Sequence, residues 1–389
     1  MPKDRMNIGV IIDEIASGSA PKIIGQEVRA LQRLGHDTES LVLKGGYSPV
    51  YNFHMEGVRV RNLMDEMPSI VRSTDMKIPG FSFFSMHHLT SPLFAPGVIK
   101  DREYDVLVTH STYTCFTTKK LKQKRHIPYI PFIWDPMSYI LPHVYSTTSL
   151  GKFMPLLEPI ARWADRFILT ECEAVITSGR LHHPLLRTLT DKDLEILYPG
   201  CFPVSDVNEK RENFIITFDR WDIGNTPHIF LDMMPKLEKD IKLVVAGHWH
   251  PESIKDSFTA QIKEKGLEGR VELIGPLDEK MIIDMCSRAL VHVHTNKEVF
   301  GMQSLEAAAC GCPIIIPEGS GVTELFENSK HGFFLKEGDI DEHAKYINEL
   351  YANPEYARKI GRAAWEAARK QTWQKHGEDL LAIINRHVG

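Results

Sequence analysis

The chain has 389 residues, of which 43% are apolar and 25% charged, and its formal net charge is −5. This length predicts two domains with full hydrophobic cores, and the composition is typical of globular proteins. The negative charge disfavours a nucleic-acid partner. The six cysteines are scattered without a CxxC pair, which favours a reduced, intracellular protein over a disulfide framework or a zinc site.

The N-terminal stretch, MPKDRMNIGVIIDE, has a short apolar segment that ends at acidic residues. It predicts a first β-strand, because the segment is too short for a signal peptide. No apolar run approaches the roughly eighteen residues that span a bilayer. We therefore expect a cytoplasmic protein, with attachment to the cytoplasmic membrane face as a further hypothesis.

The first half of the chain alternates strand and helix patterns. Pro131 weakens one of the strand predictions, because proline cannot donate to a sheet ladder. The predicted strands cover 7–12, 38–43, 105–109, 129–134 and 174–177, and the predicted helices cover 24–34, 117–125 and 155–170. This alternation is typical of a doubly wound parallel sheet.

A Pro- and Gly-containing break at 198–203 and a polar stretch to 212 indicate an interdomain linker. The alternation then restarts. The predicted strands are 214–218, 242–246, 271–274, 290–294, 314–316 and 332–335, and the closing helices are 341–352, 354–370 and 373–386. Two α/β domains with a cleft between their strand ends would form a ligand site.

Residues 298–317, EVFGMQSLEAAACGCPIIIP, are the most informative stretch. Glu298 and Glu306 flank a Phe300-Gly301 turn, good helix formers follow, and Gly311 stands where a helix ends. The apolar run 314–316 predicts a buried strand. The unit is therefore loop, helix and strand.

A helix that begins behind a glycine turn offers free N–H groups to an anion such as a phosphate. Glu298 precedes this helix and Glu306 lies about one turn inside it. Both carboxylates can then accept hydrogen bonds from hydroxyls of one ligand, and a ligand with a central diphosphate and hydroxyls at both ends is a nucleotide sugar. The alternative is an ordinary amphipathic helix with surface glutamates.

The whole string resembles the Glu-x7-Glu signature of retaining, nucleotide-sugar-dependent glycosyltransferases of family four. The resemblance implies the GT-B fold: α/β, with two Rossmann-like doubly wound parallel-sheet domains facing across a cleft. It implies an N-terminal acceptor-side domain (1–203), a C-terminal donor domain (204–370) and a helix (371–389) that crosses back. The implied activity moves a hexose from a UDP- or GDP-linked donor to a hydroxyl acceptor, a glycan or lipid-linked glycan, without a metal or other cofactor.

The resemblance assigns roles in the second domain. Glu298 and the backbone of Phe300, Gly301 and Met302 would hold the sugar and the diphosphate, and Glu306 the ribose. Arg220 matches a cation that stabilises the leaving diphosphate. The lysine expected five or six residues later is absent, and Asn225 or Thr226 stands there. Arg220 alternatively forms a surface ion pair with Asp219 or Asp222.

Gly247 and His248 follow a predicted strand at the place of the family's Gly-rich loop near the nucleotide. His248 and His250 alone are too few ligands for a metal. The pairs Asp191/Asp193 and Asp339/Asp341 lie in polar loops and predict helix caps or surface acids. These patterns favour a metal-independent reaction.

In the first domain, Gly18 and Ser19 stand where the family brings a backbone N–H to the diphosphate, although the family usually has two adjacent glycines. His110 ends a buried strand and resembles a family histidine that would contact sugar or acceptor. The alternative is a hydrogen-bonded buried histidine. Trp134 replaces a second family histidine, which puts the usual sugar contact in question.

A basic run, Lys119, Lys120, Lys122, Lys124 and Arg125, lies on a predicted helix. It is either a solvated face or a patch that docks on an anionic bilayer. An apolar loop around 81–84 would wrap a lipid-linked acceptor or pack on the domain core.

A rival to the enzyme is a non-catalytic GT-B protein that binds a nucleotide sugar or supports a partner; a phosphorylase or epimerase is less favoured.

Overall fold

The computed structural model describes residues 5–15, 19–44, 52–72, 86–145, 151–222 and 224–388. The chain folds into two compact units. Residues 1–198 and 373–389 form the N-terminal unit, and residues 199–372 form the C-terminal unit. The chain therefore returns to its first unit for its last helix.

The N-terminal unit is built on a seven-stranded parallel sheet in the order β3-β2-β1-β4-β5-β6-β7. The order reverses between β1 and β4, and open α/β sheets bind ligands at the carboxyl ends of strands beside such a reversal. The strands are β1 (Asn7–Ile12), β2 (Asp37–Val42), β3 (Val60–Asn62), β4 (Val106–His110), β5 (Tyr129–Phe132), β6 (Val175–Thr177) and β7 (Leu194–Ile196).

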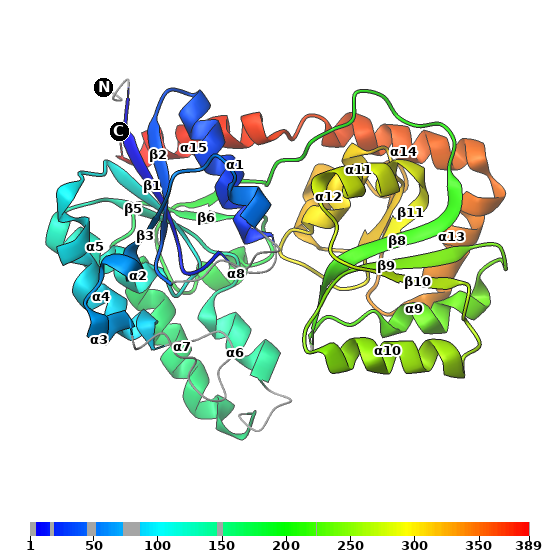
Figure 1. Cartoon of the computed structure of the whole chain (residues 1–389), viewed down its shortest axis with the longest axis horizontal. Helices are drawn as coiled ribbons and strands as arrows, with labels where there is room; N and C mark the ends of the chain where they lie inside the picture. The colour runs from blue at the N-terminus through cyan, green and yellow to red at the C-terminus, as the bar shows by residue number, and fades with distance from the viewer. Residues whose placement is uncertain are drawn as a thin grey trace. The chain divides into compact units, whose positions relative to one another are not determined.

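Helices cover the N-terminal sheet. The helices are α1 (Ala20–Arg33), α2 (Leu63–Glu66), α3 (Ser69–Arg72), α4 (His87–Val98), α5 (Cys115–Arg125), α6 (Met137–Tyr145), α7 (Met154–Leu169), α8 (His183–Leu186) and α15 (Trp373–Val388). The last helix, α15, lies beside α1 (Figure 1). Leu380 and Ile383 of α15 pack with Ile24 and Val28 of α1 over the β1 side chains, so the last helix completes this core.

One glycine lets α1 and α15 approach closely. A Cβ on Gly377 would lie 2.4 Å from the Cβ of Ala30, closer than two carbon atoms can pack. The helices therefore meet through their smallest side chains.

The C-terminal unit is built on a six-stranded parallel sheet in the order β10-β9-β8-β11-β12-β13, which reverses between β8 and β11. The strands are β8 (Glu212–Trp221), β9 (Lys242–Trp249), β10 (Val271–Ile274), β11 (Ala289–Val293), β12 (Ile314–Pro317) and β13 (Phe333–Leu335). The helices are α9 (His228–Met233), α10 (Glu252–Glu264), α11 (Glu279–Arg288), α12 (Met302–Ala309), α13 (Ile340–Ala352) and α14 (Pro354–Ala368).

Strands β8 and β9 extend past the apolar runs that predicted them. Trp221 and Trp249 end these strands side by side, with ring centroids 5.9 Å apart, and Trp249 lies 5.6 Å from Phe258 of α10. The indole N–H of Trp221 donates to the Ala246 carbonyl at 2.9 Å. This aromatic contact holds Asp219 and Arg220 on the strand.

The predicted class, two α/β units with doubly wound parallel sheets, is confirmed. Pro131 lies inside β5, aligned with Thr109 of β4, and the strand forms because Tyr129, Ile130 and Phe132 are fully buried. In the described ranges, no helix combines the length and the apolar character needed to cross a membrane. The apolar loop around 81–84 lies outside the described residues.

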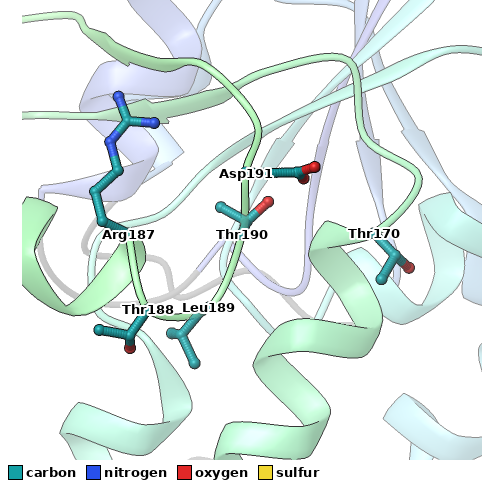
Figure 2. A pocket seen from close by; sticks show the side chains of 6 residues that line it. All are labelled: Thr170, Arg187, Thr188, Leu189, Thr190 and Asp191. Carbon is teal, nitrogen blue, oxygen red and sulfur yellow. The ribbon is translucent and has the colours of Figure 1, made fainter.

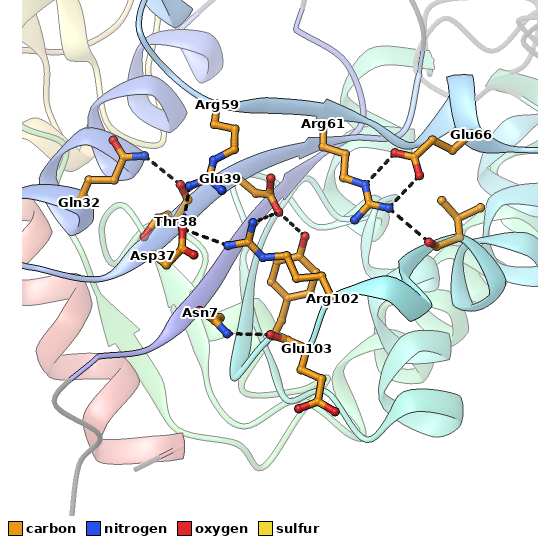
Figure 3. A network of polar contacts seen from close by, with 12 residues as sticks. Asn7, Gln32, Asp37, Thr38, Glu39, Arg59, Arg61, Glu66, Arg102 and Glu103 are labelled. Atoms are coloured by element: carbon orange, nitrogen blue, oxygen red, sulfur yellow. Dashed lines mark hydrogen bonds and ion pairs between the residues drawn. The ribbon is translucent and has the colours of Figure 1, made fainter.

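A polar network fixes the amino ends of β1 and β2 (Figure 3). Arg102 bridges Asp37 at 3.1 Å and Glu39 at 2.7 Å, and the Tyr104 hydroxyl donates to Glu39. Burial would raise the pKa of Asp37, but the charges of Arg102 and Arg59 lower it. This network lies at the edge opposite the carboxyl ends of the strands, so we assign it a structural role.

Candidate donor-binding site

The candidate site of the C-terminal unit lies where β8 and β11 end. Asp219 and Arg220 belong to the last residues of β8, His294 directly follows β11, and Glu298 lies in the loop before α12. The strand order reverses between these two strands, and open α/β sheets bind ligands at the carboxyl ends of strands beside such a reversal. Three of these residues, Asp219, His294 and Glu298, place ligand-type atoms within 4.8 Å of one another.

His294 lies between the two carboxylates. Its Nδ1 is 3.8 Å from Asp219 Oδ2, and its Nε2 is 3.6 Å from Glu298 Oε1. The ring of His294 is almost fully buried. Burial, and then the neighbouring charge of His294, lower the pKa of the nearby His292 to about 3. This shift favours a neutral, packed His292. One ligand-type atom from each of the three residues lies close enough to the others that the group could also hold a cation.

Asn225 occupies the position where a lysine was expected, and its amide is engaged. Its Nδ2 donates to Asp219 Oδ2 at 2.7 Å and to the Arg220 carbonyl at 3.2 Å. Its Oδ1 accepts from the Asn296 amide. Paired backbone bonds between Asp222 and Asn225, each 3.0 Å long, close the loop. Asn225 therefore fixes the loop beside Asp219 without adding a charge.

Arg220 is half-exposed at the end of β8. Its Nε donates to Asp222 at 2.9 Å, which is the ion pair that the sequence offered as the alternative to a diphosphate contact. An exposed pair of this kind is weak, at about 0–1 kcal/mol. Arg220 can therefore exchange Asp222 for an anionic ligand at little cost.

The N-terminus of α12 faces Glu298. Gly301 precedes the helix with φ +95°, a conformation that favours glycine, and a Cβ there would lie 3.4 Å from Glu298 Oε2. The Val322 N–H donates to the Phe300 carbonyl at 2.7 Å, and a Cβ on Gly321 would collide with the Val299 carbonyl at 2.0 Å. The 320–322 turn thus holds this loop in place.

Phe300, Met302 and Glu306 are buried in the same segment. Burial, with the nearby thiols and the charge of Glu306, raises the pKa of Cys286 and of Cys310. All six cysteines are buried and free. The predicted helix, with Glu306 about one turn inside it, is present, while the ribose contact of Glu306 stays a prediction.

The prediction of a loop at Gly247 and His248 is wrong, because β9 continues to Trp249. Gly247 is aligned with Asp219 and His248 with Arg220. A Cβ on Gly247, at φ +138°, would lie 1.8 Å from the Asp219 carbonyl. Glycine is therefore required here for strand pairing at the site.

In the N-terminal unit, Gly18 lies outside the described residues, and Ser19 is exposed at the start of α1. The Ser19 carbonyl accepts from the Ile23 N–H at 3.1 Å, but its side chain does not cap the helix. The proposed backbone contact of this segment with a diphosphate stays a prediction.

His110 is fully buried at the end of β4. Its Nε2 lies 2.7 Å from Glu27, whose other oxygen lies 3.0 Å from His376 Nε2 on α15. Burial would raise the pKa of Glu27, but the charges and hydrogen bonds of His110 and His376 lower it to about 2. His376 Nδ1 also faces the Tyr198 carbonyl at 2.7 Å, so both of its nitrogens face acceptors. This geometry matches the alternative of a hydrogen-bonded structural histidine.

Trp134, in place of the second histidine, continues an aromatic stack. Its ring lies 4.4 Å from Phe132 and 6.0 Å from His110. The following Asp135 accepts from His182 at 2.7 Å. At this position the chain has an apolar wall and a hydrogen-bonded carboxylate.

Sequence reasoning missed a second cluster, formed by Asp13, His87 and His88, after β1 and at the start of α4. His87 contacts Asp13 directly, and His88 Nε2 lies 3.1 Å from the same oxygen. Burial would raise the pKa of Asp13, but hydrogen bonds from both histidines lower it well below its usual range. The adjacent histidines at 87 and 88 were the one feature of the sequence that could have indicated this cluster. One ligand-type atom from each of these residues lies within 4.8 Å of the others, so this group could also hold a cation.

The N-terminal unit also has a hollow between the segments that precede β6 and β7 (Figure 2). It is lined by Thr170, Arg187, Thr188, Leu189, Thr190 and Asp191. These segments lead into β6 and β7, so the hollow lies at their amino ends. We do not assign it to the donor.

Two family models match the chain. The model for glycosyl transferases group 1 matches residues 204–367, and the glycosyl transferase 4-like domain matches residues 20–190. EpsD of Bacillus subtilis is 22% identical over 60% of this chain and 65% of its own length. The D-inositol 3-phosphate glycosyltransferase of Mycolicibacterium smegmatis is 22% identical over 59% of this chain and 56% of its own length. Both matches span less than two thirds of the relative.

A longer match is the uncharacterized glycosyltransferase MJ1607 of Methanocaldococcus jannaschii, 22% identical over 90% of this chain and 89% of its own length. Among solved structures, Anabaena Alr3699/HepE in complex with UDP and glucose has a TM-score of 0.74 at 15% identity, over 98% of this chain and 100% of that one. Sucrose-phosphate synthase from Thermosynechococcus elongatus has a TM-score of 0.78 at 17% identity, over 98% of each chain. These two likenesses show the fold.

The family models span both units, and the group 1 model includes the Glu298–Pro317 segment on which the resemblance rests. The chain has the GT-B fold and belongs to the glycosyl transferases group 1 family.

Proposed function

We propose that this protein is a retaining glycosyltransferase that moves a hexose from a UDP- or GDP-linked donor to a hydroxyl of a glycan or lipid-linked glycan. The observation that carries the proposal is that Arg220, Glu298 and the N-terminus of α12 all follow the carboxyl ends of two neighbouring strands, β8 and β11, between which the strand order reverses. A helix N-terminus and an arginine both favour an anion, and a carboxylate beside them accepts hydrogen bonds from hydroxyls.

In the proposed reaction, the bond between the sugar C1 and the diphosphate oxygen breaks. The acceptor oxygen bonds to C1 on the same face, and its proton passes to the leaving phosphate. Arg220 and the α12 N–H groups stabilise the charge that grows on the diphosphate. Glu298 and the backbone of 300–302 hold the sugar, and Glu306 holds the ribose. No protein nucleophile and no metal ion take part.

UDP is the first nucleotide to test, because the solved structures of HepE and of TarM from S. aureus, which share this fold, contain UDP. The sugar and the acceptor are left open by the geometry of the site. The proposed acceptor class follows from the family resemblance.

The experiment is a thermal-shift panel of the purified protein with UDP, GDP, ADP and their sugar conjugates. A ligand that binds the native state raises the unfolding midpoint by mass action. We expect the nucleotides of one base to raise the unfolding midpoint of the wild type. The Glu298→Gln and Glu306→Gln variants should lose this shift. Glu268→Gln, an exposed carboxylate before the amino end of β10, is the matched control and should keep the shift. Equal shifts in all four proteins would contradict the assignment of these carboxylates.

Asn225 favours a second candidate, a GT-B protein that binds a nucleotide sugar without catalysing transfer. Its amide is tied to Asp219 and Asn296 and supplies no charge for a departing diphosphate. Release of nucleoside diphosphate from the bound donor distinguishes the two. Donor hydrolysis or transfer that Glu298→Gln abolishes supports the enzyme, and tight binding without turnover supports the second candidate.

A further inference from the structure

Helix α7 of the N-terminal unit carries a row of large apolar side chains on its surface. Leu156, Ile160 and Trp163 are 66%, 54% and 62% exposed, and Phe167 is 39% exposed. Phe153, immediately before the helix, is 49% exposed. A folded protein tolerates single exposed apolar residues, but a contiguous row marks an interaction surface.

The spacing places these side chains on one face. Residues 156, 160, 163 and 167 are separated by four, three and four positions, so they follow one stripe of an α-helix. Ala161, Ala164 and Ile168 lie on the buried face and belong to the core. In Figure 1, α7 runs out beyond the sheet of its own unit. The helix is thus apolar on two faces, and within the described part of the chain one of them is packed in the core while the other is exposed.

Basic side chains lie beside the stripe. Lys152 stacks over Phe153 with its Nζ 5.1 Å from the ring centroid, and Arg166 is exposed on α7. The charge of Arg162 is balanced by Glu158, whose Oε1 lies 3.5 Å from the Arg162 Nε. The flank therefore carries a net positive charge.

Helix α5 adds to this charge at the end of the stripe. Phe116 lies 6.1 Å from Phe167, and Lys120 and Lys124 follow Phe116 at helical spacings of four and eight, on the same face. Lys119 and Lys122 of the basic run instead form ion pairs with Glu171 and Glu173, at 2.9 and 2.5 Å. The basic run alone therefore offers fewer free cations than its sequence indicates.

We propose that the exposed face of α7 docks this unit onto an anionic phospholipid bilayer. The apolar stripe, Phe153, Leu156, Ile160, Trp163 and Phe167, lies in the plane of the bilayer and enters the boundary between headgroups and acyl chains. It is about 21 Å long at the rise of an α-helix, and helices with a bulky apolar face and a basic flank bind membranes in this way. Lys120, Lys124, Lys152 and Arg166 contact the anionic headgroups.

The charges favour a bilayer over a second copy of the chain. A twofold contact through α7 would place the basic flank of one copy near that of the other, and like charges without partners oppose association. An anionic surface is complementary to the same flank. The proposal is independent of the sugar chemistry.

The experiment is co-sedimentation of the full chain with vesicles of phosphatidylcholine, with and without 30% phosphatidylglycerol. The variant is Ile160→Gln/Trp163→Gln, which keeps good helix formers on α7. The matched control is Met281→Gln, an apolar residue of α11 with 42% exposure. Circular dichroism and unfolding midpoints establish that all three proteins are folded.

We expect the wild type and the control to bind the anionic vesicles, and the variant to bind them at least tenfold more weakly. Binding by the wild type should also weaken at 500 mM NaCl. Equal binding by variant and wild type overturns the proposal, as does the absence of binding by the wild type. A wild-type dimer that the variant converts to monomer, without vesicle binding, also overturns it and assigns the stripe to a second copy.

Discussion

Glu27 provides the most direct test of the way the N-terminal unit is held together. It lies fully buried between His110 of β4 and His376 of α15, at 2.7 and 3.0 Å. Glu27→Gln keeps the size of the side chain and removes its charge. Breaking a buried charged network by removing one partner costs about 3–5 kcal/mol. We therefore expect the variant to loosen the contact between α1 and α15.

The pKa shift gives a second estimate and a pH window. The pKa of Glu27 falls from its ordinary value of 4.5 to about 2, because the two histidines outweigh the effect of burial. A shift of this size corresponds to about 3 kcal/mol. Because the folded form binds a proton more weakly than the unfolded chain, this stability is complete above pH 4.5 and is lost as the pH falls toward 2.

Hydrogen exchange measured by mass spectrometry at pH 3, 4, 5 and 6 separates the two units. Peptides from α1 and α15 report on the Glu27 network, and peptides from β8 and β9 are the internal control. We expect wild-type protection of α1 and α15 to fall below pH 5, and the variant to show lower protection with a smaller dependence on pH. Both proteins should keep part of their acid sensitivity, because the pKa of Asp13 is also lowered.

Glu158→Gln, which breaks only a surface contact to Arg162, should leave all peptides unchanged. The reasoning fails if Glu27→Gln and the wild type lose protection of α1 and α15 in parallel between pH 6 and 3. It also fails if the loss is equal in the β8 and β9 peptides.

Three further predictions follow from close contacts and from charge. Gly377→Ala should destabilise the N-terminal unit by about 1–3 kcal/mol in urea unfolding, because its Cβ would lie 2.4 Å from Ala30, and Ala30→Gly in the same chain should restore most of the loss. Asn225→Lys should tighten binding of the donor identified by thermal shift about tenfold by calorimetry, and unchanged affinity would place this residue away from the diphosphate. EDTA should leave donor turnover unchanged, whereas loss of turnover that Mn²⁺ restores would refute the metal-independent mechanism.

Much of the fold could be predicted because buried parallel strands have a simple signature. The runs at 7–12 and 314–316 are apolar on both faces, and each forms a strand within one residue of its predicted bounds. The ends of β8 and β9 could not be predicted in this way. Their extension depends on Trp221 and Trp249 packing with Phe258, and residues so far apart in the sequence meet only after folding.

The candidate site shows the same division. The segment from Glu298 to Pro317 was recognisable because local glycine, capping and apolar signals stand in order along the chain. The contacts of His294 with Asp219 and Glu298 were not, since they join the ends of two strands that are adjacent only in the sheet. Likewise, nothing local to His110 indicates that Glu27 and His376 surround it.

The return of residues 373–388 to the first unit has a consequence for synthesis. During translation, Ile24 and Val28 emerge long before the helix that covers them, and all of the C-terminal unit is made in the interval. The N-terminal unit therefore remains an incomplete, aggregation-prone intermediate until residues 373–388 have left the ribosome. A nascent chain stalled before residue 373 should recruit chaperones through the uncovered face of α1, and one stalled after α15 has emerged should not.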